Sequence, residues 1–388
     1  MSGEVCPVCD SRRVEGFLRR ERVPVHQNIV AAAERAAVET PRGELDLAVC
    51  AACGFIFNRA FDPARMMYGE EYDNTQSCSP AFSRHMDDLV RRLVVGRGVR
   101  GARVVEVGCG RGLFLRKLVE FEGAGNTGHG FDPSYVGDEV TLGGRLRFER
   151  RYYDSECADV PADVVVCRHV IEHVPRPLAL LGNVRKALAN APRARLFFET
   201  PCVEWILRNR VVWDFFYEHC SYFTAASLAV AFARAGFEVE GVSHVFGGQY
   251  LWLEARLPEG GARPEAPRDP GASARLAAEF ARDERELVAG WRGRLRALRA
   301  AGGVALWGAG AKGVTFANLI DSGRGLVECV VDVNPAKQGC YVPGTGHPIV
   351  APRDLPWRGV RTAVLMNPNY REENLRLLAD AGLEVTLV

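Results

Sequence analysis

The sequence lacks long apolar runs, and it lacks an excess of charge of either sign. No stretch reaches the roughly 18 apolar residues that a membrane span requires, and the first residues contain no apolar signal segment. Lysine and arginine number 49 and aspartate and glutamate 48, a formal net charge of +1. A broad surface for nucleic acid or membrane is therefore not predicted, and we expect a cytoplasmic protein of about two to three domains.

Cysteine is present in number, with 12 among 388 residues. A disulfide scaffold is not expected in a chain of this length, so reduced thiols and metal ligands are the predicted uses. Cys6 with Cys9 and Cys50 with Cys53 form two C-x-x-C pairs. Four thiolates in two such pairs can close a tetrahedral zinc site, and the absence of histidine from the pairs favours a structural role. Four coincidentally buried cysteines are the alternative.

A glycine-rich turn follows an apolar, strand-like run at 104–107. Glu106 lies in that run, and Gly108, Gly110 and Gly112 precede a segment with helical spacing. Such a corner favours nucleotide binding, because glycines let a ligand approach the backbone and the helix N-terminus offers free N–H groups. The E-x-G-x-G-x-G pattern resembles motif I of the class I S-adenosylmethionine (SAM) methyltransferases. A phosphate-binding dinucleotide turn competes, but Glu106 suits a cationic amino-acid cofactor better than a pyrophosphate.

Further strands after the turn indicate a doubly wound α/β fold. Asp132 ends the next expected strand, where a carboxylate can accept both ribose hydroxyls, and Pro133 follows it. A third strand is expected at 147–153, and we expect its terminal Tyr153, or the tyrosine before it, to stack on adenine. Alternating strands and helices imply a parallel sheet that is covered on both faces, with its ligand at the carboxyl ends of the strands.

His169 follows a fourth expected strand at 162–167. Methyltransferases place the methionine end of SAM and part of the substrate pocket in the segment after this strand, so we expect His169 at the cofactor. The polar loop at 68–80 either covers the SAM site or is a plain surface loop. The other cofactor-binding candidates lie in the glycine turn and in this loop: Cys109, Tyr72, Gln76 and Ser79.

An acid, an imidazole and two phenols lie together in an otherwise apolar stretch after a fifth expected strand at 195–201. These residues are Tyr217, Glu218, His219 and Tyr222. A histidine beside a glutamate has a partner that can orient it and support its charged form. Histidine and aromatic packing in a core is the alternative. A catalytic or substrate-binding role is favoured, because the stretch lies where substrate is expected.

A second glycine corner lies near the C-terminus. Gly308, Gly310 and Gly313 form a G-x-G-x-x-G pattern after an apolar run, and Asp332 lies 24 residues after Gly308. The pattern indicates either a second cofactor such as NAD or a helix N-terminus that holds the pyrophosphate of a nucleotide-linked substrate, with help from Lys312.

Taken in order, these pieces resemble the zinc-containing, three-domain SAM-dependent sugar C-methyltransferases of antibiotic deoxysugar pathways. The resemblance rests on the C-x-x-C pairs, the turn at 106–112, the Tyr-Glu-His segment at 217–219 and the C-terminal segments at 308–313 and 332–344, which include Lys337. It implies zinc at the four paired cysteines, SAM in the middle domain and a nucleotide-linked 4-keto sugar between the middle and C-terminal domains. It disfavours NAD.

The resemblance also implies the reaction. A base removes the acidic proton beside the ketone, and the resulting enolate carbon attacks the sulfonium methyl group. His219 matches the family's histidine and is the expected base, with Glu218 beside it, and His173 matches a polar pocket position. The chain departs from the family at Phe216, where a tyrosine is frequent, and at 366–370, where the pattern A-W-N is replaced.

These departures leave two other functions open. One is O- or N-methylation of another small metabolite. The other is a nucleic-acid-binding zinc protein with a methyltransferase-like fold, against which the near-neutral charge argues. The fold expectation is a zinc-binding module at 1–66, a class I SAM methyltransferase domain at 67–257, a linker and helix at 258–301 and a Rossmann-like substrate-binding domain at 302–388. The sequence carries no signal for the oligomeric state.

Overall fold

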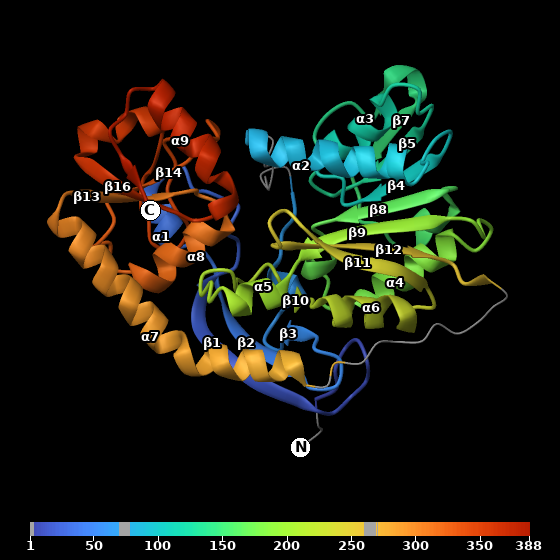
Figure 1. The fold of residues 1–388 in the computed structure, drawn as a ribbon, viewed down its shortest axis with the longest axis horizontal. Helices are drawn as coiled ribbons and strands as arrows, with labels where there is room; N and C mark the ends of the chain where they lie inside the picture. Colours follow the sequence, from blue (N-terminus) through green and yellow to red (C-terminus); the bar gives the residue numbers. More distant parts are fainter. Residues whose placement is uncertain (1–3, 70–77, 260–268, 270) are drawn as a thin grey trace.

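The computed structural model describes residues 4–69, 78–259, 269 and 271–388. In this part of the chain, three sheets form the framework, with four, eight and five strands. The eight-stranded sheet and the five-stranded sheet lie side by side with the four-stranded sheet below them (Figure 1). None of the described helices is both long and apolar enough to span a membrane.

The four-stranded sheet is antiparallel and is built mainly from the N-terminal segment. Its strand order is β1 (Val14–Pro24), β2 (Arg42–Cys50), β3 (Ile56–Asn58) and β10 (Ser221–Tyr222), with the short helix α1 (Glu34–Val38) between β1 and β2. Leu45, Leu47 and Val49 alternate along β2 and are buried. Because β10 comes from much later in the chain, this sheet fixes the segment that contains His219.

The eight-stranded sheet has a parallel centre and antiparallel edges. Its order is β11 (Glu238–Val245), β12 (Tyr250–Arg256), β9 (Arg195–Pro201), β8 (Val164–Arg168), β4 (Arg103–Val107), β5 (Thr127–Phe131), β7 (Leu146–Glu149) and β6 (Val140–Thr141). The sequence predicted parallel strands, and the five from β9 to β7 are parallel. β11 and β12 are antiparallel, because only a short turn joins them. The third predicted strand ends at Glu149, so Tyr153 lies beyond it.

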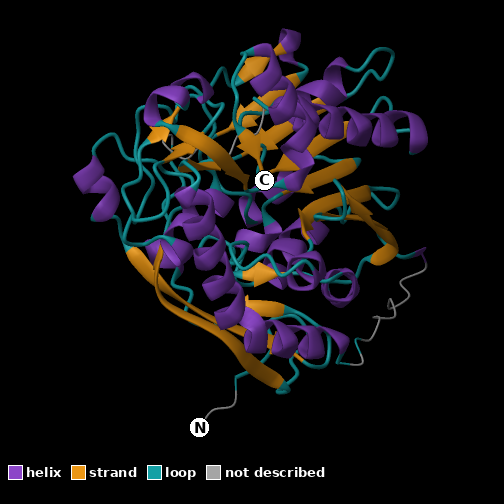
Figure 2. Cartoon of the chain, turned by 60° about the vertical axis from the view of Figure 1, so that its left-hand side comes forward, coloured by secondary structure: helices purple, strands orange, loops and turns teal. Residues whose placement is uncertain are grey.

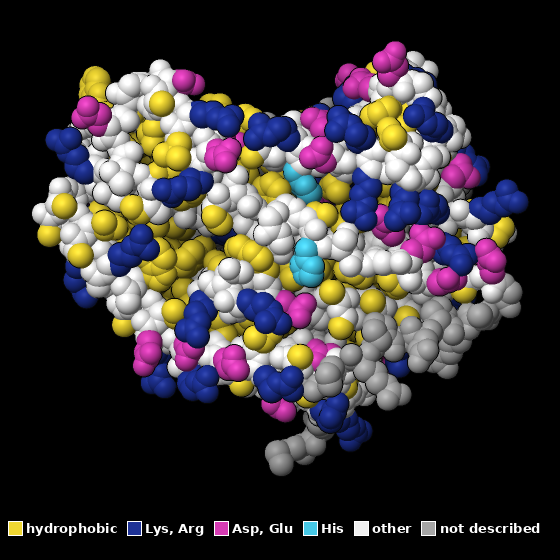
Figure 3. Space-filling view, viewed as in Figure 1, with side chains coloured by type: hydrophobic (Ala, Val, Ile, Leu, Met, Phe, Trp, Pro, Cys, Tyr) yellow, Lys and Arg dark blue, Asp and Glu magenta, His cyan; other side chains and the backbone are white. Residues whose placement is uncertain are grey.

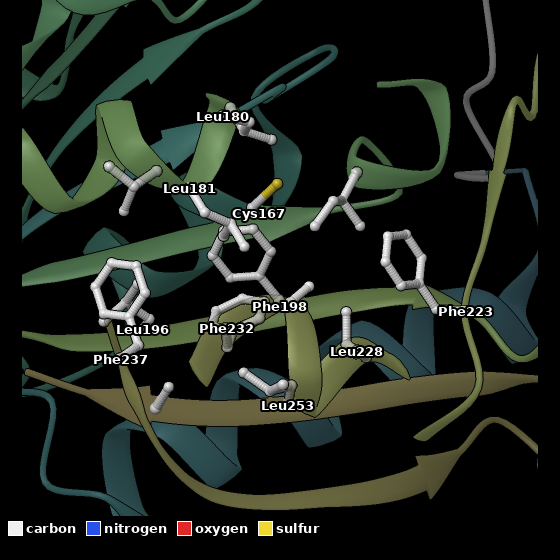
Figure 4. Close-up of a cluster of buried hydrophobic side chains, with 14 of the residues drawn as sticks. Cys167, Leu180, Leu181, Leu196, Phe198, Phe223, Leu228, Phe232, Phe237 and Leu253 are labelled. Carbon is white, nitrogen blue, oxygen red and sulfur yellow. The ribbon is translucent and has the colours of Figure 1, made fainter. Parts of the chain in front are cut away.

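Helices cover both faces of this sheet, as predicted. α2 (Pro80–Arg91) and α3 (Leu113–Glu120) pack on one face, and α4 (Pro177–Ala187) and α6 (Ala225–Arg234) pack on the other. Strand alternation decides which side chain goes where: in β9, Phe197 faces the first pair of helices and Phe198 faces the second. Phe198 meets Phe232 of α6 edge to face at 4.8 Å (Figure 4).

The C-terminal part begins with the long helix α7 (Ala272–Ala300). A parallel sheet follows, in the order β15 (Ile349–Val350), β14 (Cys329–Val331), β13 (Gly303–Trp307), β16 (Val360–Leu365) and β17 (Thr386–Leu387), with helices α8 (Ala311–Ile320) and α9 (Arg371–Asp380). α7 contacts both β1 and β13, so it joins the N-terminal sheet to the C-terminal one. Figure 2 shows the long N-terminal strands running along the outside of the helices.

Candidate functional site

The turn after β4 adopts backbone conformations that favour glycine. Gly108 and Gly110 have φ of +70° and +52°, in the left-handed region. A Cβ atom on Gly108 would lie 2.1 Å from a methyl group of Val170. The N–H of Gly110 donates to a carboxylate oxygen of Asp132 at 2.8 Å. The carboxylate at the end of β5 therefore holds the glycine turn in place.

Glu106 lies beneath this turn and is almost completely buried. One of its carboxylate oxygens accepts the N–H of Leu115, in the first turn of α3, at 3.2 Å. Burial raises the pKa of Glu106 to about 8, against the opposing effect of the nearby Arg168 charge.

A first cavity opens at the carboxyl ends of β4, β5 and β8. It brings together most of the predicted cofactor-binding residues: Glu106, Gly108, Cys109, Gly110, Asp132, Pro133, Tyr153 and His169. Gly112 instead precedes α3 with φ of +72°, where a Cβ atom would lie 2.5 Å from the Phe148 ring. The sequence interpretation missed the apolar wall formed by Phe82, Met86 and Phe114, because these residues look like ordinary core positions of α2 and α3.

A second cavity lies between the eight-stranded sheet and the C-terminal sheet. Its walls come from both, and the surface is notched between these two lobes (Figure 3). All six residues predicted to bind substrate line it: Gly308, Gly310, Lys312, Gly313, Asp332 and Lys337. The sequence interpretation missed several polar residues that also line it, because they come from separate segments without a shared motif: Asn28, Glu172, Asp214, Gln249, Asn367 and Glu373.

The second glycine corner repeats the geometry of the first. Asp332 accepts the N–H of Ala309 at 2.7 Å, as Asp132 accepts that of Gly110. Lys312 forms an ion pair with Asp214 of the middle part of the chain. Lys337 donates to the Ala309 carbonyl oxygen at 3.2 Å. Lys312 thus already has an anionic partner across the cavity.

The segment at 217–222 separates the residues that the sequence grouped together. His219 lines the second cavity, whereas Tyr217, Glu218 and Tyr222 line neither cavity and are fully buried. Glu218 accepts the backbone N–H groups of Gln27 and Asn28, so it holds the N-terminal segment. A catalytic role for these three residues stays a prediction. In the fold, none of them faces either cavity.

The hydroxyl groups of the two tyrosines in this segment also form hydrogen bonds to backbone groups. The Tyr217 hydroxyl oxygen accepts the N–H of Asp62 at 2.9 Å. The Tyr222 hydroxyl contacts the backbone N–H and carbonyl oxygen of Phe216, each at 3.1 Å. Pairing of β10 with β3 turns these side chains toward the N-terminal sheet and leaves His219 facing the second cavity.

His219 and His173 meet where the two cavities approach each other. Their rings are perpendicular with centroids 4.8 Å apart, and His173 lines the first cavity. Nδ1 of His173 lies 3.0 Å from the Tyr68 hydroxyl. Burial, together with the positive charges of His173, His169 and Lys312, holds the pKa of His219 well below its usual range. The low pKa keeps His219 unprotonated at neutral pH, and it also makes the imidazole a weaker proton acceptor.

A buried charge cluster lies beside these two imidazoles. Glu199 is fully buried, and its carboxylate lies 2.8 Å from Nε of Arg168 and 2.5 Å from Nε2 of His85. His169 lies between Glu172 and Glu199. Its Nδ1 is 3.5 Å from a carboxylate oxygen of Glu172, and its Nε2 is 3.5 Å from a carboxylate oxygen of Glu199. Burial alone would lower the pKa of His169, but the charges of the two carboxylates raise it to about 9.

The four paired cysteines converge as predicted. Sγ of Cys6 lies 3.7 Å from that of Cys53, and Sγ of Cys9 lies 3.5 Å from that of Cys50. None of the four forms a disulfide, and all four sulfur atoms lie within 4.8 Å of one another. Thiolates at about 2.3 Å from a tetrahedral zinc ion are separated by about 3.8 Å, so the four sulfurs fit such an ion.

The predicted cover loop lies mostly outside the described residues, and with it Tyr72 and Gln76. Ser79 is described, and it lines the second cavity rather than the first. Its hydroxyl oxygen accepts the N–H of Phe82, which caps α2.

Comparisons with known proteins find methyltransferases. A family model described as a methyltransferase domain matches residues 81–242, and one described as a C-methyltransferase C-terminal domain matches residues 272–382. The C-methyltransferase NovU of Streptomyces niveus is 27% identical over 386 residues, which cover 95% of this chain and 90% of NovU.

Two further matches are shorter. The ubiquinone biosynthesis O-methyltransferase of Vibrio cholerae serotype O1 is 32% identical over 109 residues, covering 26% of this chain and 43% of that protein. The structure of magnesium protoporphyrin IX methyltransferase (ChlM) from Synechocystis PCC 6803 with bound SAH aligns with a TM-score of 0.36 and 20% identity. That alignment covers 48% of this chain and 88% of ChlM.

Proposed function

We propose that this chain, which matches models of a methyltransferase domain and of a C-methyltransferase C-terminal domain, is a SAM-dependent C-methyltransferase that methylates a carbon atom of a nucleotide-linked 4-keto deoxysugar through an enolate. The observation that carries this proposal is the position of His219. This imidazole faces the second cavity and meets the His173 ring of the first edge to face, so a base lies where substrate and methyl donor would meet.

The first cavity has the residues to hold SAM. Asp132 lies at the end of β5, where a carboxylate can accept ribose hydroxyls, and Tyr153 offers an aromatic face for adenine. SAM supplies an electrophilic methyl group on its sulfonium. The apolar wall of Phe82, Met86 and Phe114 would limit the access of water to a cofactor bound in this cavity.

The second cavity has residues that can hold the diphosphate of a nucleotide-linked sugar. Gly308 and Gly310 leave the N-terminus of α8 open to an anion, and Lys337 lies beside it. Lys312 contributes positive charge although it is paired with Asp214, because its amino group also lines the cavity. The sugar would then extend from this end of the cavity toward His219.

The chemistry needs a neutral base, and the environment of His219 provides one. A 4-keto group acidifies the C–H bond on the neighbouring carbon, and a nitrogen atom of His219 takes that proton. Phe216 packs against His219 with ring centroids 4.1 Å apart, which restricts the imidazole and excludes water from it. The enolate carbon formed in this step is the nucleophile for methyl transfer.

We also propose that Cys6, Cys9, Cys50 and Cys53 hold one structural zinc ion. Their sulfur separations and the absence of disulfides support this assignment.

A panel of nucleotide-linked 4-keto sugars, scored by mass spectrometry for the gain of one methyl group, tests the proposed function. Active protein should also exchange the substrate α-proton with deuterated solvent. We expect His219→Gln to abolish both reactions, whereas His244→Gln, on the exposed surface of β11, should retain both. Retained exchange in His219→Gln would place the base elsewhere. Methylation at an oxygen or nitrogen atom would identify the alternative acceptor chemistry.

A further inference from the structure

We propose that His169 is a second catalytic residue, a protonated imidazole whose fixed positive charge stabilises the enolate formed when His219 removes the substrate proton. The inference rests on the proposed function, and it assigns to His169 a role beyond contact with the cofactor.

The position of His169 supports this role. Among the described residues, His169 alone lines both cavities, so its ring faces substrate as well as methyl donor. Its backbone has φ of +55°, a conformation that non-glycine residues rarely adopt and that recurs at functional sites. The ring is held by packing against Tyr250, with centroids 4.6 Å apart.

The charges around His169 require a cation. Glu172 and Glu199 are two carboxylates with 2% and 0% of their side-chain surface exposed. The guanidinium of Arg168 balances one of them through its contact with Glu199. His169 lies 3.5 Å from each carboxylate and supplies a second positive charge when it is protonated. Glu199 also contacts His85, whereas a neutral His169 would leave Glu172 without an ion-pair partner among the described residues, beside the place where the enolate forms.

The same cation has opposite effects on the two partners of the proton transfer. Its charge helps to lower the pKa of His219, which keeps that base unprotonated but weakens it as a proton acceptor, so any gain in rate has to come from the enolate. When the substrate C–H bond breaks, the proton goes to His219 and the electron pair spreads over the carbon and the carbonyl oxygen. The negative charge then lies near the His169 imidazolium, which is already in place and needs no rearrangement. The new C–C bond to the methyl group forms as the sulfonium S–C bond breaks.

A metal ion is the competing explanation for this group of side chains. Glu172, His173 and His219 bring potential ligand atoms within 4.8 Å of one another. However, the Glu172 oxygen in that group lies 3.5 Å from Nδ1 of His169, so a divalent cation bound there would compete with a protonated His169 for the same carboxylate. The geometry therefore favours the imidazolium.

Replacement of His169 tests the proposal, with solvent exchange of the substrate α-proton as the readout. We expect His169→Asn to slow exchange by about 100-fold or more, as when one stabilising donor is removed from an oxyanion site, with a much smaller change in affinity for SAM. His169→Lys keeps a positive charge and should recover part of the rate. His244→Asn is the matched control and should exchange at the wild-type rate, because His244 is exposed and lines neither cavity. The thermal midpoint of each variant checks its fold.

The pH dependence of kcat/KM is a second test, because the loss of a purely structural residue would not shift this profile. Loss of the His169 charge raises the pKa of His219, so the acidic limb of kcat/KM should shift to higher pH in His169→Asn. In the unchanged protein the rate should fall above about pH 9, where His169 loses its proton. The titratable and charged groups that face His169 or its carboxylate partners, and so enter this profile, are Glu172, Glu199, Arg168, His85, His219 and Tyr250.

Three results would overturn the inference. The first is wild-type exchange in folded His169→Asn. The second is a loss of SAM affinity that accounts for all of its lost activity. The third is a metal equivalent beyond the cysteine site that disappears in Glu172→Gln.

A measurement without substrate separates this inference from the proposed function. The ¹⁵N resonances of the His169 ring should show the protonated form at about pH 8, and a neutral ring there would overturn the inference. If the unchanged protein methylates none of the 4-keto sugars, the proposed function fails whatever the ring's protonation state. If it does methylate one, and His169→Asn does so equally well, only the inference fails.

Discussion

At the residue scale, a single carboxylate holds each of the two glycine turns. Asp132 and Asp332 each accept an N–H from the turn on the neighbouring strand, and each also accepts an N–H two residues further along its own loop. One oxygen of each carboxylate thus orders the turn, and the other orders the loop after the strand. A ligand that binds such a carboxylate joins a contact network that is already formed.

Asp132 therefore has a testable effect on SAM binding. We expect Asp132→Ala to weaken SAM affinity by about 10- to 100-fold, since it removes a charged acceptor together with the support of Gly110. Isothermal titration calorimetry measures the change. Asp138→Ala is the control, because Asp138 is exposed on the same loop and its described contact is through its backbone oxygen. Equal affinities in the two variants would remove Asp132 from the SAM site.

At the element scale, helix α2 connects the two cavities. Phe82 and Met86 on α2 line the first cavity, and Ser79 at its start lines the second. Glu373 of α9 accepts from the Ser79 hydroxyl and from the N–H of Ala81 at 2.8 Å each. A carboxylate from the C-terminal domain thus satisfies the free N-terminus of a helix that forms a wall of the cofactor cavity.

The cap on α2 provides a prediction. Glu373→Ala should cost about 1–2 kcal/mol of stability at this contact and lower the thermal midpoint by a few degrees. SAM affinity should fall as well, because α2 carries part of the wall of the first cavity. Differential scanning calorimetry and calorimetric titration check both effects. Glu372→Ala is the matched control from the same helix, since Glu372 is exposed and its ion pair with Arg376 is at the surface. A midpoint as low in Glu372→Ala as in Glu373→Ala would contradict this account.

At the scale of the whole molecule, the second cavity draws on the N-terminal segment as well as on the two larger lobes. Asn28 reaches it from the N-terminal segment, where Glu218 accepts its backbone N–H. Arg42 of β2 donates to the Gly344 carbonyl oxygen in the C-terminal domain. The N-terminal segment therefore contributes Asn28 to the wall of the cavity, while β2 of the N-terminal sheet contacts the C-terminal domain.

The four cysteines can be tested at the same scale. We expect about one zinc per chain by elemental analysis, and Cys50→Ser should lose that zinc and lower the thermal midpoint. Because Asn28 belongs to the same N-terminal segment, Cys50→Ser should also weaken substrate binding. Cys78→Ser, at an exposed cysteine away from the four, should keep the metal. A folded, metal-free protein would refute the zinc site.

Short sequence patterns were sufficient to predict many features of this molecule. The glycine turns at Gly108 and Gly308, the acids at Asp132 and Asp332, and the cysteine pairs were all readable from the sequence. A turn with positive φ needs glycine, a strand end presents its acid to the ligand edge, and two cysteines three residues apart bind one ion. Each of these requirements acts within a short segment, so spacing alone reveals it.

The contacts between distant segments were decided only by the tertiary structure. Glu218 is next to His219 in sequence, yet it turns away to hold Asn28, because β10 joins a sheet made of much earlier strands. His169 was expected at the cofactor, but its two carboxylate partners come from different segments and no spacing indicates both. Side-chain direction and the balance of buried charge depend on which strands pair, and the amino-acid sequence expresses that pairing only once the chain has folded.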